Sequence, residues 1–220
     1  MTALFRYTAA ILFHSQRYVA PVLVFLLGAG AFVHGDAHQP AIPVFGAMAG
    51  VEFAFAIWLT VSLVNVEDPV QRTITAVNTG RSRCILVAAT LVVLACCLVL
   101  DALVLAVPVV FGFTGLTGLD LVAGGEALLT GACAGIAIGL LTSRLVIRRI
   151  GFALLAILVL FVFFLVVPWL PPVHPVIFLL AGHASATGGL IASTSAYTAI
   201  AVVMLVASVL VTQLVAARRD

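Results

Sequence analysis

The chain has 220 residues, of which 64% are hydrophobic and 8% are charged, and its formal net charge is +2 at pH 7. This small number of charged side chains cannot cover the surface of a water-soluble domain of this size. The composition therefore predicts an all-α membrane protein. No basic patch alternates with aromatic residues, which argues against a nucleic-acid partner. The small positive charge instead suits contact with the anionic headgroups of a lipid bilayer.

Residues 1–17 precede the first apolar run and project as an amphipathic helix at about 100° per residue. The apolar side holds Leu4, Phe5, Thr8, Ile11 and Leu12, and the opposite side holds Arg6, Ala10, His14 and Arg17. We expect an interfacial helix along the inner leaflet, with its arginines directed toward headgroups or a cytoplasmic partner. A plain extension of the first span is the alternative.

The apolar runs that follow predict six membrane-spanning helices, because crossing ~30 Å of hydrocarbon takes about 20 helical residues. The predicted spans are Tyr18–Val33, Ala41–Val64, Cys84–Val110, Leu121–Ser143, Ile150–Leu170 and Leu190–Ala216. We expect one transmembrane domain over residues 1–220, with a six-span bundle at 18–216 and a cytoplasmic tail at 217–220. The four cysteines, at 84, 96, 97 and 133, all lie outside the expected outer loops, so we expect packed thiols and no disulfide.

The orientation of the spans follows from the arginines. All ten Lys/Arg positions are arginine and form four clusters: Arg6/Arg17, Arg72/Arg81/Arg83, Arg144/Arg148/Arg149 and Arg218/Arg219. Positive charge near span ends is retained in the cytoplasm, whereas the expected outer loops, around 34–41, 111–120 and 168–188, contain no arginine. We therefore predict a multi-pass protein whose N- and C-termini are both cytoplasmic.

The stretch NVEDPVQRTITAVNTGRSR between the second and third spans has the signals of a short cytoplasmic helix. Asp68 suits the N-cap, Pro69 the first helical position and Gln71 the third, from which its side chain can bond back to the cap. The glycine of the TGR sequence can end the helix. With Glu67 before it and Arg72 on it, this helix is a candidate docking element, and a solvated connector is the alternative.

Two further patterns concern packing. Gly131, Gly135 and Gly139 recur every four residues in the fourth span, which lets another helix, from this chain or from a second copy, approach closely. Before the sixth span, Val176–Gly182 forms an apolar run of about 10 Å if helical, too short to cross. We expect a re-entrant half-helix there that packs on protein, and an ordinary loop with an apolar tip is the alternative.

Three carboxylates fall inside predicted spans, namely Glu52, Asp101 and Glu126, with no arginine at those depths. A lone charge in hydrocarbon costs at least about 3 kcal/mol, so each must be neutral, hydrogen-bonded or exposed to a wet cavity. Two interpretations stay open: a translocation path or proton relay, and a structural bond between helices. Asp120 differs, because it stands where a helix should begin and is expected to be a surface cap.

Several chemistries are disfavoured by the residues present. The chain contains no lysine, so it lacks a phosphate-loop lysine, and H-E-x-x-H and G-x-S-x-G do not occur. No histidine lies deep in a span, and HGDAH at 34–38 is expected to be a solvated loop more than a metal site. We expect no catalytic residue, no metal site and no cofactor in this chain.

Together these features resemble the permease subunit of the type-2 ABC exporters, in a small actinobacterial-like form. The string AIWLTVSLVNVEDPVQR is similar to the corresponding stretch of small actinobacterial permeases, and the arginine-only, Ala/Val-rich composition suits a GC-rich genome. The resemblance implies a bacterial plasma-membrane protein that pairs with a second permease copy, as a homodimer. It also implies a separate ATP-binding cassette subunit that binds ATP and Mg²⁺ and contacts Arg6, His14, Arg17, Glu67, Asp68, Pro69, Gln71 and Arg72.

Two other function classes stay open. A proton-coupled secondary transporter would use Glu52, Asp101 and Glu126, although no inverted repeat is visible between the halves of the chain. A purely structural membrane subunit is the third possibility.

Overall fold

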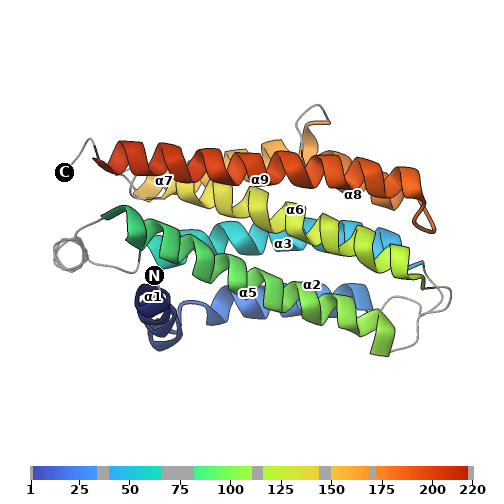
Figure 1. Ribbon diagram of the computed structural model, residues 1–220, viewed down its shortest axis with the longest axis horizontal. Coiled ribbons are helices and arrows are strands. Elements are labelled where there is room, and N and C mark those ends of the chain that lie inside the picture. The colour runs from blue at the N-terminus through green and yellow to red at the C-terminus, as the bar shows by residue number, and fades with distance from the viewer. Residues whose placement is uncertain are drawn as a thin grey trace.

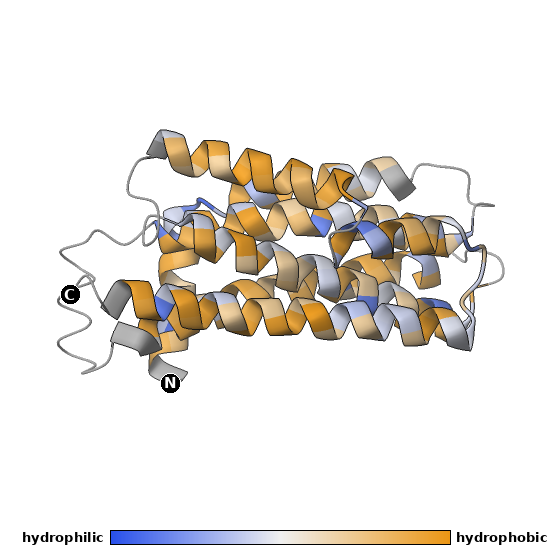
Figure 2. Ribbon diagram, turned by 90° about the horizontal axis from the view of Figure 1, so that it is seen from above, coloured by the Kyte–Doolittle hydropathy of each residue, from blue (hydrophilic) through white to orange (hydrophobic). Residues whose placement is uncertain are grey.

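The computed structural model describes residues 2–33, 40–65, 82–110, 116–143, 150–168 and 172–217, and every regular element in these ranges is an α-helix. The helices are α1 Thr2–Ser15, α2 Val19–Val33, α3 Ala41–Val64, α5 Ser82–Val110, α6 Gly118–Thr142, α7 Ile150–Val166, α8 Val173–Ala181 and α9 Gly188–Ala217. The long helices run side by side along the bundle, and α1 is turned across one end of it (Figure 1). Apolar residues cover most of the helices, as Figure 2 shows, so the all-α membrane class is confirmed.

Four of the described helices are long and apolar enough to cross a membrane: α3, residues 85–110 of α5, α6 and residues 188–215 of α9. Their ends lie within three residues of the predicted ones. The prediction of six spans is not met. Helices α2 and α7 contain 15 and 17 residues, which corresponds to about 22 and 25 Å against a hydrocarbon core of ~30 Å. Counting α1 and α2 together as one bent span raises the number to five at most.

The N-terminal helix is amphipathic as predicted. Leu12 and Thr8 are buried, at 0% and 4% exposure, while Arg6, Ala10, His14 and Arg17 are exposed. The apolar side packs against α5. The chain turns by 79° between α1 and α2, where Gln16 adopts a left-handed φ of 53°, so α1 is not a straight extension of the first span.

The core centres on the contact between α3 and α6, and every residue from 130 to 140 is buried. A Cβ on Gly135 would lie 2.6 Å from the carbonyl oxygen of Phe53, and a Cβ on Gly139 would lie 2.6 Å from Cβ of Thr60. At Gly131 the corresponding neighbour is the carbonyl oxygen of Ala49. The predicted tight packing is confirmed, and the neighbour is a helix of the same chain.

The segment before the last span is a short helix, α8, which begins three residues earlier than predicted and is capped by Gly182. It packs on α3, where Gly46 leaves room for it. A Cβ at that position would lie 3.0 Å from Cβ of Leu180 and 3.2 Å from the carbonyl oxygen of Ile177. The alternative of an ordinary loop is therefore wrong.

All four arginine clusters adjoin helix ends that gather at one end of the bundle. These are α1, the start of α5, the end of α6 and the end of α9 (Figure 1). The predicted cytoplasmic helix, with Glu67, Asp68, Pro69, Gln71 and Arg72, lies outside the described residues. Among the described cysteines, Cys96, Cys97 and Cys133 are free.

Candidate functional site

The structure brings two of the three predicted carboxylates together. Glu52 of α3 is 0% exposed and Asp101 of α5 is 5% exposed, and the two groups are close enough to interact electrostatically. Among the described residues, no N–H or O–H group donates a hydrogen bond to any of their four oxygen atoms, and the Cys97 thiol lies beside Glu52. The result is a buried pair of like groups where α3 packs on α5.

The groups nearest to this pair are thiols. Cys97 of α5 lies beside both carboxylates, and Cys133 of α6 lies near Asp101. A thiol is a weak donor and supplies little compensation for a buried charge. The described residues contain no set of three or more His, Cys, Asp or Glu side chains arranged to hold a metal ion.

Such a pair requires a positive partner. Two negative charges in an apolar interior repel each other and have lost the solvation that water would provide. Natural proteins rarely bury carboxylates without pairing or hydrogen-bonding them. A proton or another cation must therefore complete the Glu52–Asp101 pair.

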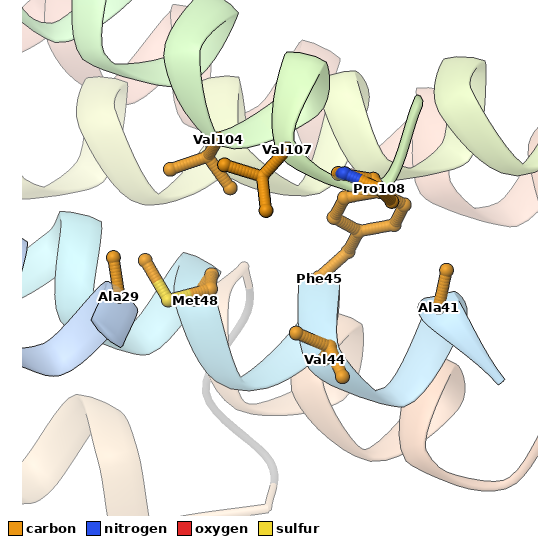
Figure 3. A pocket seen from close by; sticks show the side chains of 8 residues that line it. All are labelled: Ala29, Ala41, Val44, Phe45, Met48, Val104, Val107 and Pro108. Carbon is orange, nitrogen blue, oxygen red and sulfur yellow. The ribbon is translucent and has the colours of Figure 1, made fainter. Parts of the chain in front are cut away.

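A small void of about 30 Å³ lies next to the pair along the α3–α5 contact. Met48 stands four residues before Glu52 and Val104 three residues after Asp101, so the void is about one helical turn from the carboxylates. Figure 3 shows its lining from α2, α3 and α5, with the ring of Phe45 beneath Pro108. All eight lining residues are apolar: Ala29, Ala41, Val44, Phe45, Met48, Val104, Val107 and Pro108.

Glu126 belongs to a different contact, between α6 and α9. Its side-chain oxygens accept hydrogen bonds from Ser195 Oγ at 2.6 Å and from Thr194 Oγ1. One turn away, Thr130 Oγ1 donates to the Glu126 carbonyl at 2.7 Å and lies 2.9 Å from Thr198 Oγ1. The structural interpretation therefore fits Glu126, whose partners on α9 were not predicted from the sequence. The signal was the spacing of hydroxyls in IASTSAYT, which places three of them on one helix face.

Asp120 is not a surface cap, because its exposure is only 3%. Its carboxylate accepts the backbone N–H of Thr117 at 2.7 Å, while Thr117 Oγ1 accepts the N–H of Asp120 at 3.3 Å, forming a capping box at the start of α6. The second oxygen accepts the N–H of Ala186 at 2.6 Å. Asp120 was correctly predicted as a helix-start residue, but it also ties the α8–α9 connection to α6, which buries it.

An apolar groove of about 640 Å³ lies on the outer surface of the bundle, between α2, α3, α7 and α8. Its floor is formed by α3, including Val51 and Trp58, and its walls include Val24, Gly28, Phe161 and Phe178. Nothing in its lining is charged, so it suits lipid or another apolar surface.

The candidate coupling residues are only partly within the described ranges. Arg6, His14 and Arg17 of α1 are exposed, and α1 lies at the end of the bundle where α5 begins and α6 and α9 end. The other five lie outside the described residues. No protein-family model, curated protein or solved structure matches this chain.

Proposed function

We propose that this chain is the membrane-spanning subunit of an ATP-driven exporter. It forms the translocation path as a dimer and couples to a separate nucleotide-binding subunit. The observation that carries the proposal is the placement of α1. This helix lies across the end of the bundle at 79° to α2, buries Leu12 and exposes Arg6, His14 and Arg17. A monomeric channel or carrier has no evident need for such a charged transverse platform.

The proposal includes a full topology. Both termini are cytoplasmic, and α1 lies along the inner leaflet. The gathering of arginine-adjacent helix ends at one end of the bundle supports this orientation. Helix α8 enters the outer leaflet and returns, which its packing on Gly46 of α3 makes possible, since irregular backbone at membrane depth must be covered by protein.

Purification from the native host tests the proposal. An ATPase should co-elute with the tagged chain. The double variant Arg6→Glu/Arg17→Glu should weaken that association while leaving the chain in the membrane. Arg6→Lys/Arg17→Lys, which keeps both charges, should retain most of it and serves as the matched control.

The predicted cytoplasmic helix that begins at Asp68 offers a second test. Asp68→Ala should remove an N-cap, cost about 1 kcal/mol of local helix stability, and lower coupled ATPase activity without affecting insertion. If no ATPase co-elutes, and Asp68→Ala and Glu67→Ala change nothing, the chain is not such a subunit.

A proton-coupled secondary transporter is the second candidate, and the unpaired Glu52 and Asp101 favour it. In that case one carboxyl must bind and release a proton in each cycle, which an amide cannot do. The chain would then be active alone in liposomes under an imposed pH gradient, with no ATPase present.

A further inference from the structure

The Glu52–Asp101 pair lacks the group that would complete it. Both side chains are at least nine-tenths buried, and all four oxygens are without a hydrogen-bond partner among the described residues. The contrast with Glu126 is informative, because that carboxylate has two side-chain donors although it is less buried. A structural carboxylate is supplied with donors in this bundle, and the α3–α5 pair is not.

The surroundings decide which class of cation fits. A divalent metal ion takes six or more oxygen ligands, or a set of several Cys and His ligands, and the described residues offer no such group. The void beside the pair is lined only by apolar side chains, including the aromatic ring of Phe45. An organic monocation matches both features, since its charge can lie between the carboxylates and its apolar body against Phe45, Met48 and Val104.

Access requires the α3–α5 contact to open. The void holds only about one or two water molecules, too little for an organic cation. Pro108 has no N–H to bond the carbonyl of Val104, so the last turn of α5 is weakly tied to the rest of the helix. Phe45 fills the space below it, and Gly124 of α6 makes room for the ring, since a Cβ there would lie 2.6 Å from Phe45 Cδ2. This end of α5 lies at the opposite end of the bundle from α1.

We propose that Glu52 and Asp101 bind a hydrophobic organic monocation, which reaches them when the end of α5 moves away from Phe45. In the closed bundle both carboxyls are protonated. The arriving cation displaces one proton to solvent and pairs with the carboxylate it leaves, while the other carboxyl stays neutral. The inference rests on the proposed function only in treating this cation as cargo.

Cation binding should then strengthen as pH rises, because proton and cation compete for the same carboxylates. Among the described residues, the other titratable groups close to the pair are the Cys97 and Cys133 thiols. Helices α2 and α7 contain none, and His174 of α8 stacks on Phe178. Glu126 of α6 is bonded to α9, and α1 packs at the far end of α5.

The test uses the purified full chain in lipid nanodiscs and radiolabelled tetraphenylphosphonium, with binding to empty nanodiscs subtracted. Wild-type chain should bind the probe saturably, at least tenfold more tightly at pH 8 than at pH 5. Glu52→Gln and Asp101→Asn should each weaken binding at least tenfold. Glu126→Gln, an amide swap at the α6–α9 contact, should leave it within twofold, and tetraphenylborate, an anion of the same shape, should not compete.

Glu52→Asp distinguishes a loss of charge from a loss of folding. Because this variant keeps the carboxylate, it should bind the probe with an affinity within a few-fold of wild type. Equal loss in Glu52→Asp and Glu52→Gln would show that packing and not charge matters, and would overturn the proposal. Undiminished binding by both amide variants, or equal binding of tetraphenylborate, would do the same. Because the chain is tested alone, binding that persists when no ATPase co-elutes would leave the site standing and refute only the exporter assignment.

Discussion

At the scale of single residues, buried hydroxyls and buried carboxyls differ in where they find hydrogen-bond partners. Buried threonines satisfy their hydroxyls within their own helix: Thr60 bonds the carbonyl of Ala56 at 2.6 Å, and Thr212 bonds that of Ser208 at 2.7 Å. A carboxylate accepts but cannot donate, and the helix backbone has no free N–H in its interior to offer it. Glu126 therefore depends on hydroxyls from α9, whereas Glu52 and Asp101 have no comparable donor.

The α6–α9 bond should contribute measurably to stability. Thr194→Val removes the donor to Glu126 and should lower the free energy of unfolding by about 0.6–1.7 kcal/mol, the range of hydrogen bonds between membrane helices. Thr212→Val is the matched control, since Thr212 is equally buried on the same helix but bonds only its own backbone. Denaturant unfolding in detergent micelles measures the free energy of unfolding of both variants. Equal losses would show that the hydrogen bond between α6 and α9 does not contribute to stability.

At the scale of elements, two contacts hold the helices in position. One is the close backbone contact between α3 and α6, and the other is the hydrogen bond from the α8–α9 connection to Asp120 of α6. Lipid gives no hydrophobic drive for two helices to associate, so close van der Waals packing through small residues replaces it. The nearest contact of a Cβ at Gly135 or Gly139 would be 2.6 Å, which is shorter than real Cβ atoms adopt, so neither position has space for alanine.

Gly135→Ala should therefore destabilise the bundle by about 1–3 kcal/mol, the typical cost of overpacking. Gly125→Ala on the same helix should be neutral or slightly stabilising, because its Cβ would lie 3.6 Å from Leu105 Cδ1, an ordinary contact. The thermal unfolding temperature of each variant in detergent would show the difference. A neutral result for Gly135→Ala would mean that α3 and α6 lie further apart than described.

Asp120 bonds both the start of α6 and the α8–α9 connection, so its substitution should affect both. Asp120→Ala should cost roughly 1–2 kcal/mol through the lost capping box and should also expose the α8–α9 connection to proteolysis. Asp120→Asn keeps a carbonyl oxygen for the Ala186 N–H and should lose less. Limited proteolysis that is identical in the two variants would argue against the bond to Ala186.

At the scale of the whole molecule, cysteine labelling tests which end of the bundle faces the cytoplasm. In a variant lacking the native cysteines, Ser185→Cys in the exposed α8–α9 connection should react with a membrane-impermeant maleimide in intact cells. Arg17→Cys should react only after lysis. His174 is a poor reporter, because it is 9% exposed and its ring stacks on Phe178 at 4.3 Å. External labelling at position 17 would reverse the proposed topology.

The sequence by itself determined the class of the protein, the ends of the four long helices, the two faces of α1 and the tight packing at Gly131, Gly135 and Gly139. These features depend on local quantities, namely run length, helical periodicity and the absence of a side chain. It misjudged the number of spans, because α7 ends at Val166, before its predicted end, and α2 contains only 15 residues. It also placed Asp120 on the surface, because the burying partner is 66 residues away.

Only the tertiary structure decided which carboxylates meet. Glu52, Asp101 and Glu126 look alike in sequence, since each is a single acid in an apolar run. Whether a side chain meets a donor, another acid or lipid depends on the rotation of each helix about its axis and on its neighbour. Packing between distant segments sets both. That packing gave Glu126 the hydroxyls of α9 and buried Glu52 and Asp101 near each other without comparable donors.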